Sequence, residues 1–207
     1  MRLNGKRVIV TGANRSIGKA IALLFAKEGA ELVISYRSDK KGAEDVVRNS
    51  EGRATALYAD FSTLKDVEKF FYETKTILGS IDILINNAAG YNTDHFFDLK
   101  PQAFEDLLKI TVLTPFYLSQ LVAKDMVDQG IKGNIINVSS IAVNTYVPNR
   151  LAHSSGKAAL NRLTQSMALD LAAYDIRVNA IAPGNTTENS EDNHQIPLGR
   201  TGSPSDQ

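Results

Sequence analysis

The chain has 207 residues, of which 43% are hydrophobic, which suits one globular domain with a sizeable core and excludes a disordered chain. Its 23 lysines and arginines are balanced by 23 aspartates and glutamates, so no overall charge favours nucleic acid or an anionic membrane as a partner. The chain has no cysteine, which excludes disulfides, thiolate nucleophiles and thiolate metal sites.

Strand and helix patterns alternate through the first half of the chain. The β-branched run Arg7 to Val10 predicts a strand that ends at Gly12. Apolar residues at helical spacing then predict a helix over residues 16–27, which Gly29 stops. In the same way the sequence predicts strands at residues 31–36, 53–59 and 81–86, and helices at residues 40–49 and 64–78.

A long helical segment, Pro101 to about Gln129, opens the second half. Pro115 lies inside it, and because proline removes a backbone donor, we expect the helix to bend or break near Thr111. Strands at residues 134–138 and 176–181 flank a further helix at residues 151–173. The alternation predicts a single domain, residues 1–207, with a parallel sheet covered by helices on both faces. Residues 185–207 are predicted to form a flexible tail.

The sequence offers no membrane or export signal. No apolar run approaches the roughly 18 residues that are needed to span a bilayer. The first predicted strand begins almost at once, at Lys6, with no apolar signal segment before it. These patterns predict a cytoplasmic protein that binds neither membrane nor nucleic acid.

A glycine-bearing loop, Thr11–Gly18, joins the first strand to the first helix. A dinucleotide needs such a loop to turn tightly, to approach the pyrophosphate without a Cβ clash, and to aim free helix N–H groups at the phosphates. Gly12 and Gly18 meet these needs, and Ser16 is a good helix N-cap. The spacing also suits a purely structural turn, but the strand before the loop and the amphipathic helix after it favour nucleotide binding.

Four segments, in this order along the chain, carry a resemblance to a known family: Thr11–Gly18, Asn137–Ser140, His153–Lys157 and Asn179–Gly184. Together they resemble the short-chain dehydrogenase/reductase family across essentially the whole chain. The resemblance implies a doubly wound α/β fold of Rossmann type with strand order 3-2-1-4-5-6, here without the family's seventh strand.

The resemblance also implies a set of cofactor-binding residues. Asp60 with Phe61 matches the family's adenine-contacting pair, Ala89 stands where the family has a glycine, and Pro183-Gly184 matches the loop that covers the nicotinamide. The full set of matching positions is Gly12, Asn14, Arg15, Ser16, Ile17, Gly18, Arg37, Asp60, Phe61, Asn87, Ala88, Ala89, Lys157, Pro183, Gly184 and Thr186.

Charge at the end of the second strand predicts which cofactor binds. A site that selects NAD(H) places a carboxylate there, which would repel a 2′-phosphate. The strand ends instead in Ser35-Tyr36-Arg37, and in the family a basic residue at either Arg15 or Arg37 marks a preference for NADP(H). We therefore expect NADP(H) rather than NAD(H). The alternative is that both arginines are only solvated surface residues.

Four residues occupy the family's catalytic positions. Ser140 would polarise a substrate carbonyl, and Lys157 would hold the nicotinamide ribose. His153 stands where the family has its proton-donating tyrosine, and Thr111 stands where it has a relay asparagine. The resemblance thus implies an oxidoreductase that acts on a small-molecule carbonyl or secondary alcohol, with reduction favoured.

His153 is the position that decides the chemistry. Its ordinary pKa of about 6.5 suits acid–base catalysis. However, Lys157 and an oxidised nicotinamide are both cationic and disfavour the imidazolium form. His153 is therefore either the proton donor or a ligand-binding or inert position, and Tyr146 on the preceding loop is a weaker candidate donor. The second function hypothesis is an NADP(H)-binding protein without turnover, with a regulatory or structural role.

The family also suggests an assembly. Relatives pair the helices that match residues 101–129 and 151–173 with those of a second subunit, so we expect a homodimer or a tetramer. The segment Ile196–Pro204 resembles the one that leads into a further helix and a seventh strand in relatives. Without them, one sheet edge is exposed, and we expect lower stability or shielding by a partner. His95 and His194 are interpreted as solvated surface residues, and no metal site is predicted.

Overall fold

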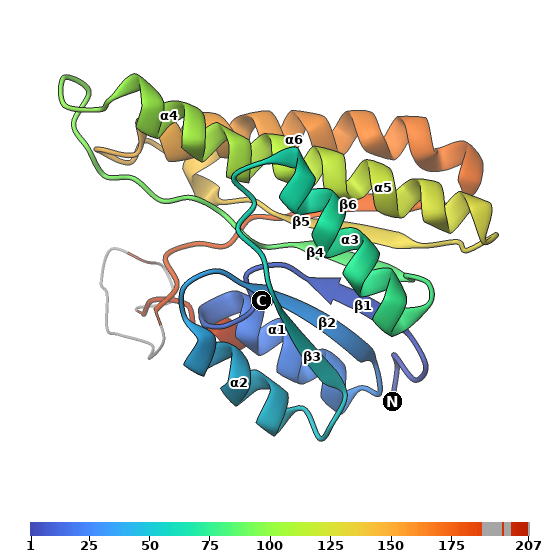
Figure 1. The fold of residues 1–207 in the computed structure, drawn as a ribbon. Coiled ribbons are helices and arrows are strands. Elements are labelled where there is room, and N and C mark those ends of the chain that lie inside the picture. Colours follow the sequence, from blue (N-terminus) through green and yellow to red (C-terminus); the bar gives the residue numbers. More distant parts are fainter. Residues whose placement is uncertain (188–195, 197–199, 207) are drawn as a thin grey trace.

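A computed structural model describes residues 1–187, 196 and 200–206 of the chain. Its core is a six-stranded parallel sheet with the order β3-β2-β1-β4-β5-β6 (Figure 1). The predicted doubly wound fold and its strand order are therefore confirmed. The strands are β1 (Arg7–Val10), β2 (Glu31–Tyr36), β3 (Ala54–Tyr58), β4 (Ile83–Asn86), β5 (Asn134–Val138) and β6 (Arg177–Ile181).

The helices lie where their apolar spacing predicts them. They are α1 (Ser16–Lys27), α2 (Lys40–Asn49), α3 (Leu64–Leu78), α4 (Pro101–Leu108), α5 (Thr114–Asp128) and α6 (Leu151–Leu171). A 3-10 turn, Ala172–Tyr174, follows α6 and takes up the last residues of the helix predicted at residues 151–173. Among the described residues, no helix is both long and apolar enough to cross a membrane.

The sheet separates two hydrophobic clusters, because successive side chains of a strand point to opposite faces. On one face, Val8 and Val10 pack with buried residues of α1 and α2. On the other face, Ile9 packs with buried residues of α3, α5 and α6. Figure 1 shows these two helical layers on either side of the sheet. Both faces of the strands are therefore buried, which explains their continuous apolar runs.

The predicted interruption of the long helix lies at Thr111. A π-helical turn, Lys109–Leu113, separates α4 from α5. Pro115 at the start of α5 has no N–H to donate to the carbonyl group of Thr111, four residues earlier. The helix accommodates this loss by widening its turn rather than by ending, and π turns of this kind are frequent at functional sites.

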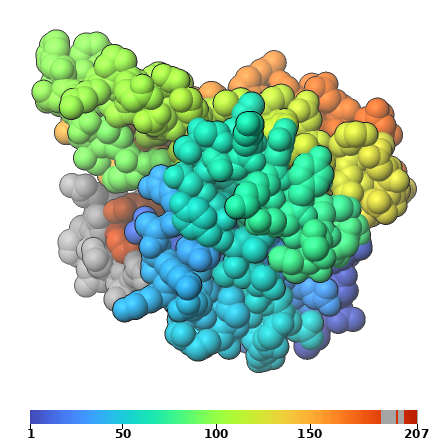
Figure 2. Space-filling model, in the orientation of Figure 1, coloured from blue at the N-terminus to red at the C-terminus, as the bar shows by residue number. Residues whose placement is uncertain are grey.

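All six strands end at one edge of the sheet, and the loops that follow them gather there. The segment between β4 and α4 projects from this side as a lobe, which is light green in Figure 2. The described residues at the C-terminus lie beside α1 (Figure 1), where Gly202 forms a β-bridge with Thr186. His194 and the acidic cluster at residues 188–193 lie outside the described residues.

Candidate functional site

The loop after β1 turns at Gly12, which has a φ of +63° that a residue with a side chain rarely adopts. Its N–H donates a 2.9 Å hydrogen bond to the hydroxyl oxygen of Ser35 on β2. A Cβ atom at Gly18 would lie 2.5 Å from Nδ2 of Asn87 and 2.6 Å from the carbonyl oxygen of Gly12. Both glycines are therefore required for the tight turn and the close packing predicted from sequence.

Asn87 holds this loop from the neighbouring strand. Its side-chain amide donates to the carbonyl oxygens of Thr11 and Gly12, both at 2.9 Å. In return, the Thr11 hydroxyl oxygen accepts the backbone N–H groups of Asn87 and Ala88, both at 3.0 Å. The structure thus brings Asn87 and Ala88 against the glycine loop, where the Asn87 side chain fixes the shape of the turn.

The start of α1 is open to an anion. Arg15 is the N-cap residue, and it makes no side-chain capping bond; the first turn holds no acidic side chain. The first backbone N–H groups of the helix, which include those of Ser16, Ile17 and Gly18, have no partner within a helix. Ser16 does not act as the N-cap suggested by its sequence, because its φ of +48° is left-handed whereas an N-cap residue is extended.

Arg15 and Arg37 are both exposed, and neither forms an ion pair with another described residue. Asp39, which the sequence did not single out, contacts the glycine loop through Asn14. Its carboxylate accepts the Gly42 N–H at 2.9 Å and the Asn14 side-chain amide at 3.4 Å. The bond from Gly42 lowers the pKa of Asp39, with smaller contributions from Asn14 and Arg15. An aspartate just before a helical pattern is an N-cap signal that could have found it.

The two residues expected to contact the adenine, Asp60 and Phe61, are half-buried or buried. Asp60 is half-buried at the end of β3. The ring of Phe61 is buried and packs edge-on against Phe70, with ring centroids 5.4 Å apart. The carbonyl oxygen of Phe61 accepts the Thr114 hydroxyl at 3.4 Å, so this residue is held within the protein. Ala89 is exposed, so its extra methyl group is not packed against the protein.

Lys157 lies in the interior of the site and is only 4% exposed. Its ammonium group donates to the carbonyl oxygen of Val138 at the end of β5, at 2.5 Å. Burial lowers the pKa of Lys157 to about 8, because a charged amine is poorly solvated there. The ammonium therefore predominates at pH 7, and the neutral amine becomes populated as the pH rises to about 8.

His153 lies one helical turn before Lys157 and is half-buried. Burial lowers its pKa below the ordinary value, and the charges of Lys157 and Arg150 lower it further; the carbonyl group of Gly90 opposes them. The imidazole is therefore neutral at pH 7. Its Nδ1 atom is buried and has no hydrogen-bond partner among the described residues.

Ser140 follows β5 on the same edge of the sheet. Its hydroxyl oxygen accepts the N–H of Ala142 at 3.2 Å, which leaves its own proton free to be donated to a substrate oxygen. The next N–H, that of Ile141, donates to the carbonyl oxygen of Pro183 at 3.1 Å. This bond joins the loop after β5, which carries Ser140, to the loop after β6, which carries Gly184 and Thr186.

Thr111 is fully buried in the π-helical turn, and its hydroxyl oxygen has no partner among the described residues. A Cβ atom at Gly156 would lie 3.2 Å from its Cγ2 atom, so Thr111 packs against α6 one residue before Lys157. Thr111 therefore lies beside α6, the helix that carries His153 and Lys157. Tyr146, the weaker candidate donor, is 92% exposed on its loop.

Two further residues at this site were not found from sequence. The ring of Tyr91, on the loop after β4, contacts the His153 ring edge-on at a centroid distance of 5.8 Å. The guanidinium carbon of Arg150 lies 3.9 Å from the centroid of the same Tyr91 ring. In the sequence, only the position of Arg150, three residues before His153, could have indicated that it belongs to this site. Within the described part of the chain, no cluster of residues could hold a metal ion.

Known proteins are similar to this chain in sequence and in fold. A sequence model of the family described as short chain dehydrogenase matches residues 6–196. An uncharacterized oxidoreductase from Thermotoga maritima is 38% identical over 188 residues, which cover 90% of this chain and 74% of the relative.

Solved structures agree. Acetoin dehydrogenase YohF from Salmonella typhimurium superposes with a TM-score of 0.90 at 33% identity, covering 97% of this chain and 84% of that protein. A short chain dehydrogenase from Burkholderia cenocepacia, solved in complex with NADP, has a TM-score of 0.91 at 30% identity and covers 100% of this chain and 88% of its own. The chain therefore belongs to the short-chain dehydrogenase family of oxidoreductases.

Proposed function

We propose that this protein is an NADP(H)-dependent oxidoreductase that reduces a carbonyl group or oxidises a secondary alcohol, with His153 as the group that moves the proton. The observation that carries the proposal is the buried amine of Lys157, which lies one helical turn after His153 and donates to the carbonyl oxygen of Val138 at the end of β5. Ser140 follows β5 and the uncapped start of α1 follows β1, both at the carboxyl edge of the sheet.

The fit to a dinucleotide rests on the start of α1 and on two cations. Because the first turn has no side-chain cap and no acid, a pyrophosphate would take up its free N–H groups. Arg15 and Arg37 would bind the 2′-phosphate that distinguishes NADP(H) from NAD(H), and Lys157 would hold the nicotinamide ribose. When bound, NADP(H) supplies or accepts the hydride.

The remaining chemistry falls to side chains of this chain. Ser140 donates its hydroxyl proton in a hydrogen bond to the substrate oxygen and so holds the carbonyl in place. In alcohol oxidation, the neutral imidazole of His153 accepts the hydroxyl proton directly. In carbonyl reduction, His153 must first be protonated, and the pKa lowered by burial and by Lys157 shifts that form to acid pH.

A second candidate function is an NADP(H)-binding protein without turnover. The neutral state of His153 favours it, because a neutral imidazole is a poor proton donor at pH 7. In addition, no described residue hydrogen-bonds to the hydroxyl of Thr111, which stands at the family's relay position. Both functions predict NADPH binding, but only the first predicts its oxidation by a carbonyl compound.

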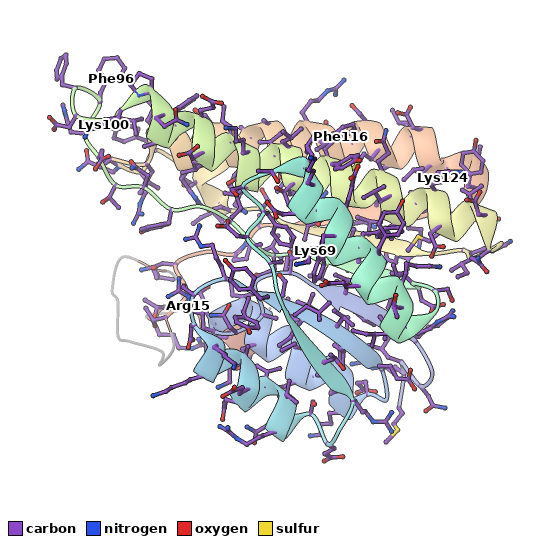
Figure 3. All side chains as sticks on the ribbon, viewed as in Figure 1. Arg15, Lys69, Phe96, Lys100, Phe116 and Lys124 are labelled. Carbon is purple, nitrogen blue, oxygen red and sulfur yellow. The ribbon has the colours of Figure 1, made fainter. Side chains whose placement is uncertain are left out.

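The assembly proposed with this function is a homodimer through residues 101–129 and 151–173. An apolar hollow of about 480 Å³ lies between α4, α5 and α6, and Phe116, labelled in Figure 3, lines it. A second copy of the same face would cover this surface. Phe116→Asp should then yield monomers in light scattering, whereas Tyr72→Asp, at an exposed position of α3, should leave the assembly unchanged. A Phe116→Asp protein of unchanged mass would contradict this assembly.

The test of the main proposal compares three proteins. NADPH binding is followed by the change in cofactor fluorescence, and turnover by NADPH oxidation with a panel of ketones and aldehydes. We expect the wild type and His153→Tyr to turn over and His153→Phe to lose activity while it still binds NADPH. His95→Phe, at an exposed histidine outside the site, is the matched control. An unchanged rate in His153→Phe would show that His153 is not the proton donor.

A further inference from the structure

The guanidinium group of Arg150, close to His153, lacks part of its hydrogen bonding. Arg150 directly precedes α6 and is half-buried. Its Nη1 atom is buried from solvent, yet it has no hydrogen-bond partner among the residues that the structure describes. No carboxylate in the described ranges lies within ion-pair distance of it. A buried donor that lacks an acceptor costs free energy, so such groups call for a specific explanation.

The position of Arg150 is fixed by Tyr91. The guanidinium carbon lies 3.9 Å from the centroid of the Tyr91 ring, close enough for a cation–π interaction. The same ring contacts the imidazole of His153 at 5.8 Å. Arg150 and His153 therefore lie against one aromatic ring, and the charge of Arg150 is felt at the imidazole. The guanidinium is held beside the reacting group instead of extending freely into water.

The ring itself comes from the projecting lobe. Tyr91 lies on the loop between β4 and α4, and Phe96 on the same loop lies at the outer end of the lobe (Figures 2 and 3). The lobe thus reaches back to the start of α6 through Tyr91, which contacts both His153 and Arg150.

We propose that the substrate carries a carboxylate, so that it is an oxo acid or the corresponding hydroxy acid, and that Arg150 binds this carboxylate while the carbonyl group lies at Ser140 and His153. A guanidinium presents two parallel N–H groups that match the two oxygens of a carboxylate. The inference rests on the proposed function for the carbonyl step. Reduction would take one hydride from NADPH onto the carbonyl carbon and one proton from the protonated His153 onto its oxygen, converting the oxo acid, NADPH and a proton into the hydroxy acid and NADP⁺.

The charges around His153 support an anionic substrate. The charged groups that act on its imidazole are Lys157 and Arg150, and both are cations. A carboxylate bound at Arg150 would offset this positive charge and favour the protonated imidazole that carbonyl reduction requires. A neutral ketone would leave the like charges of Arg150 and Lys157 uncompensated.

The test uses matched substrate pairs on the full chain. Straight-chain 2-, 3- and 4-oxo acids are compared with their methyl esters, with NADPH as the reductant and kcat/KM as the readout. We expect the wild type to prefer one of the acids, and Arg150→Met to lower that acid-to-ester ratio by about ten- to hundredfold, mainly through KM, because a charged hydrogen bond is lost. Arg150→Lys should recover part of the ratio. Arg162→Met, at an exposed arginine of the same helix, should keep the wild-type ratio.

Equal kcat/KM for acids and esters in the wild type would overturn the inference, as would an unchanged ratio in Arg150→Met. If no carbonyl compound is turned over, the proposed function fails on its own. Calorimetric titration with 4-oxopentanoate, with and without NADPH, then decides the carboxylate site. Binding to the wild type and Arg162→Met but not to Arg150→Met supports it, whereas equal binding or none refutes it.

Discussion

The two halves of the site differ in how completely their polar groups are satisfied. In the cofactor half, Thr11, Gly12, Ser35 and Asn87 exchange hydrogen bonds with one another, so this part of the loop is complete within the protein. In the catalytic half, buried polar atoms of Thr111, Ser139, Arg150 and His153 have no hydrogen-bond partner among the described residues. The contrast teaches that the protein alone shapes the nucleotide loop, whereas described residues of the catalytic half leave buried polar atoms without a partner.

The strongest way to break this contrast is to disrupt the cofactor half. A Gly18→Val side chain would place Cβ within 2.6 Å of the Gly12 carbonyl oxygen, so the loop would have to move. We expect loss of NADPH binding and a loss of about 3 kcal/mol in unfolding free energy, at the upper end of overpacking costs. Fluorescence titration and urea unfolding measure the two effects.

Gly184→Ala is the control for stability, because its Cβ would meet only the Ile141 side chain, at 3.9 Å. It should retain the wild-type free energy of unfolding. If Gly18→Val bound NADPH as tightly as the wild type, the close packing of α1 against the Asn87 loop would have no role in the site.

In the catalytic half, Lys157→Met should separate function from stability. Activity should fall by at least about a hundredfold, the lower range for acid–base machinery. The lowered pKa of about 8 shows that the folded state disfavours the ammonium, so its removal stabilises the fold. The loss of the hydrogen bond to Val138 opposes this gain. At pH 7 the free energy of unfolding should therefore rise by about 1–2 kcal/mol.

The pH dependence of that stability has a defined sign. Between about pH 8 and the ordinary lysine pKa, the unfolded wild type binds a proton at this amine that the folded state has released. The stability of the wild type therefore rises with pH across this window, and the advantage of Lys157→Met should shrink. Urea unfolding at pH 7 and pH 9.5 tests this, and an advantage that grew with pH would refute it.

The next smaller expected effect is the pH dependence of carbonyl reduction, which follows the protonation of His153. Because its pKa is lowered, only a small part of the imidazole is protonated at pH 7. For a carbonyl substrate, kcat/KM should rise as the pH falls, by up to about tenfold per pH unit until that pKa is reached. His153→Tyr should not show this acid rise. A flat profile in the wild type would exclude imidazolium as the proton donor.

The smallest expected effect concerns Ser16, whose backbone is strained within the cofactor loop. Its φ of +48° suits glycine better than serine. Ser16→Gly should raise the free energy of unfolding by up to about 1 kcal/mol, the lower range for a residue held in a left-handed conformation. Thermal and urea unfolding measure the change. Glu51→Gly, at a similar φ of +55° outside the site, is the control for a general gain at such positions.

The fold could be predicted from sequence because its signals are local. The apolar strand runs and the helical spacing gave nearly every boundary, and Pro115 marked the interruption at Thr111. Residues 81–86 are an exception: β4 begins only at Ile83, although the Asp82 N–H still donates to the carbonyl oxygen of Arg7.

The site could be predicted only where a motif lies within one segment. Gly12 and Gly18 belong to one loop, and His153 and Lys157 to one helix, so their spacing placed them. Ser35, Tyr91 and Arg150 act through partners on other segments. No local pattern reports such pairings, because they depend on how the loops meet at the edge of the sheet.

The hydrogen bonds that fix the glycine loop in advance also bear on the thermodynamics of nucleotide binding. A loop already held in its binding shape loses little conformational entropy when a ligand arrives, so more of the contact energy remains as affinity. Crystals grown with and without nucleotide should then superpose closely at residues 11–18. The ordering that accompanies binding should instead be concentrated around α6 and the lobe that carries Tyr91.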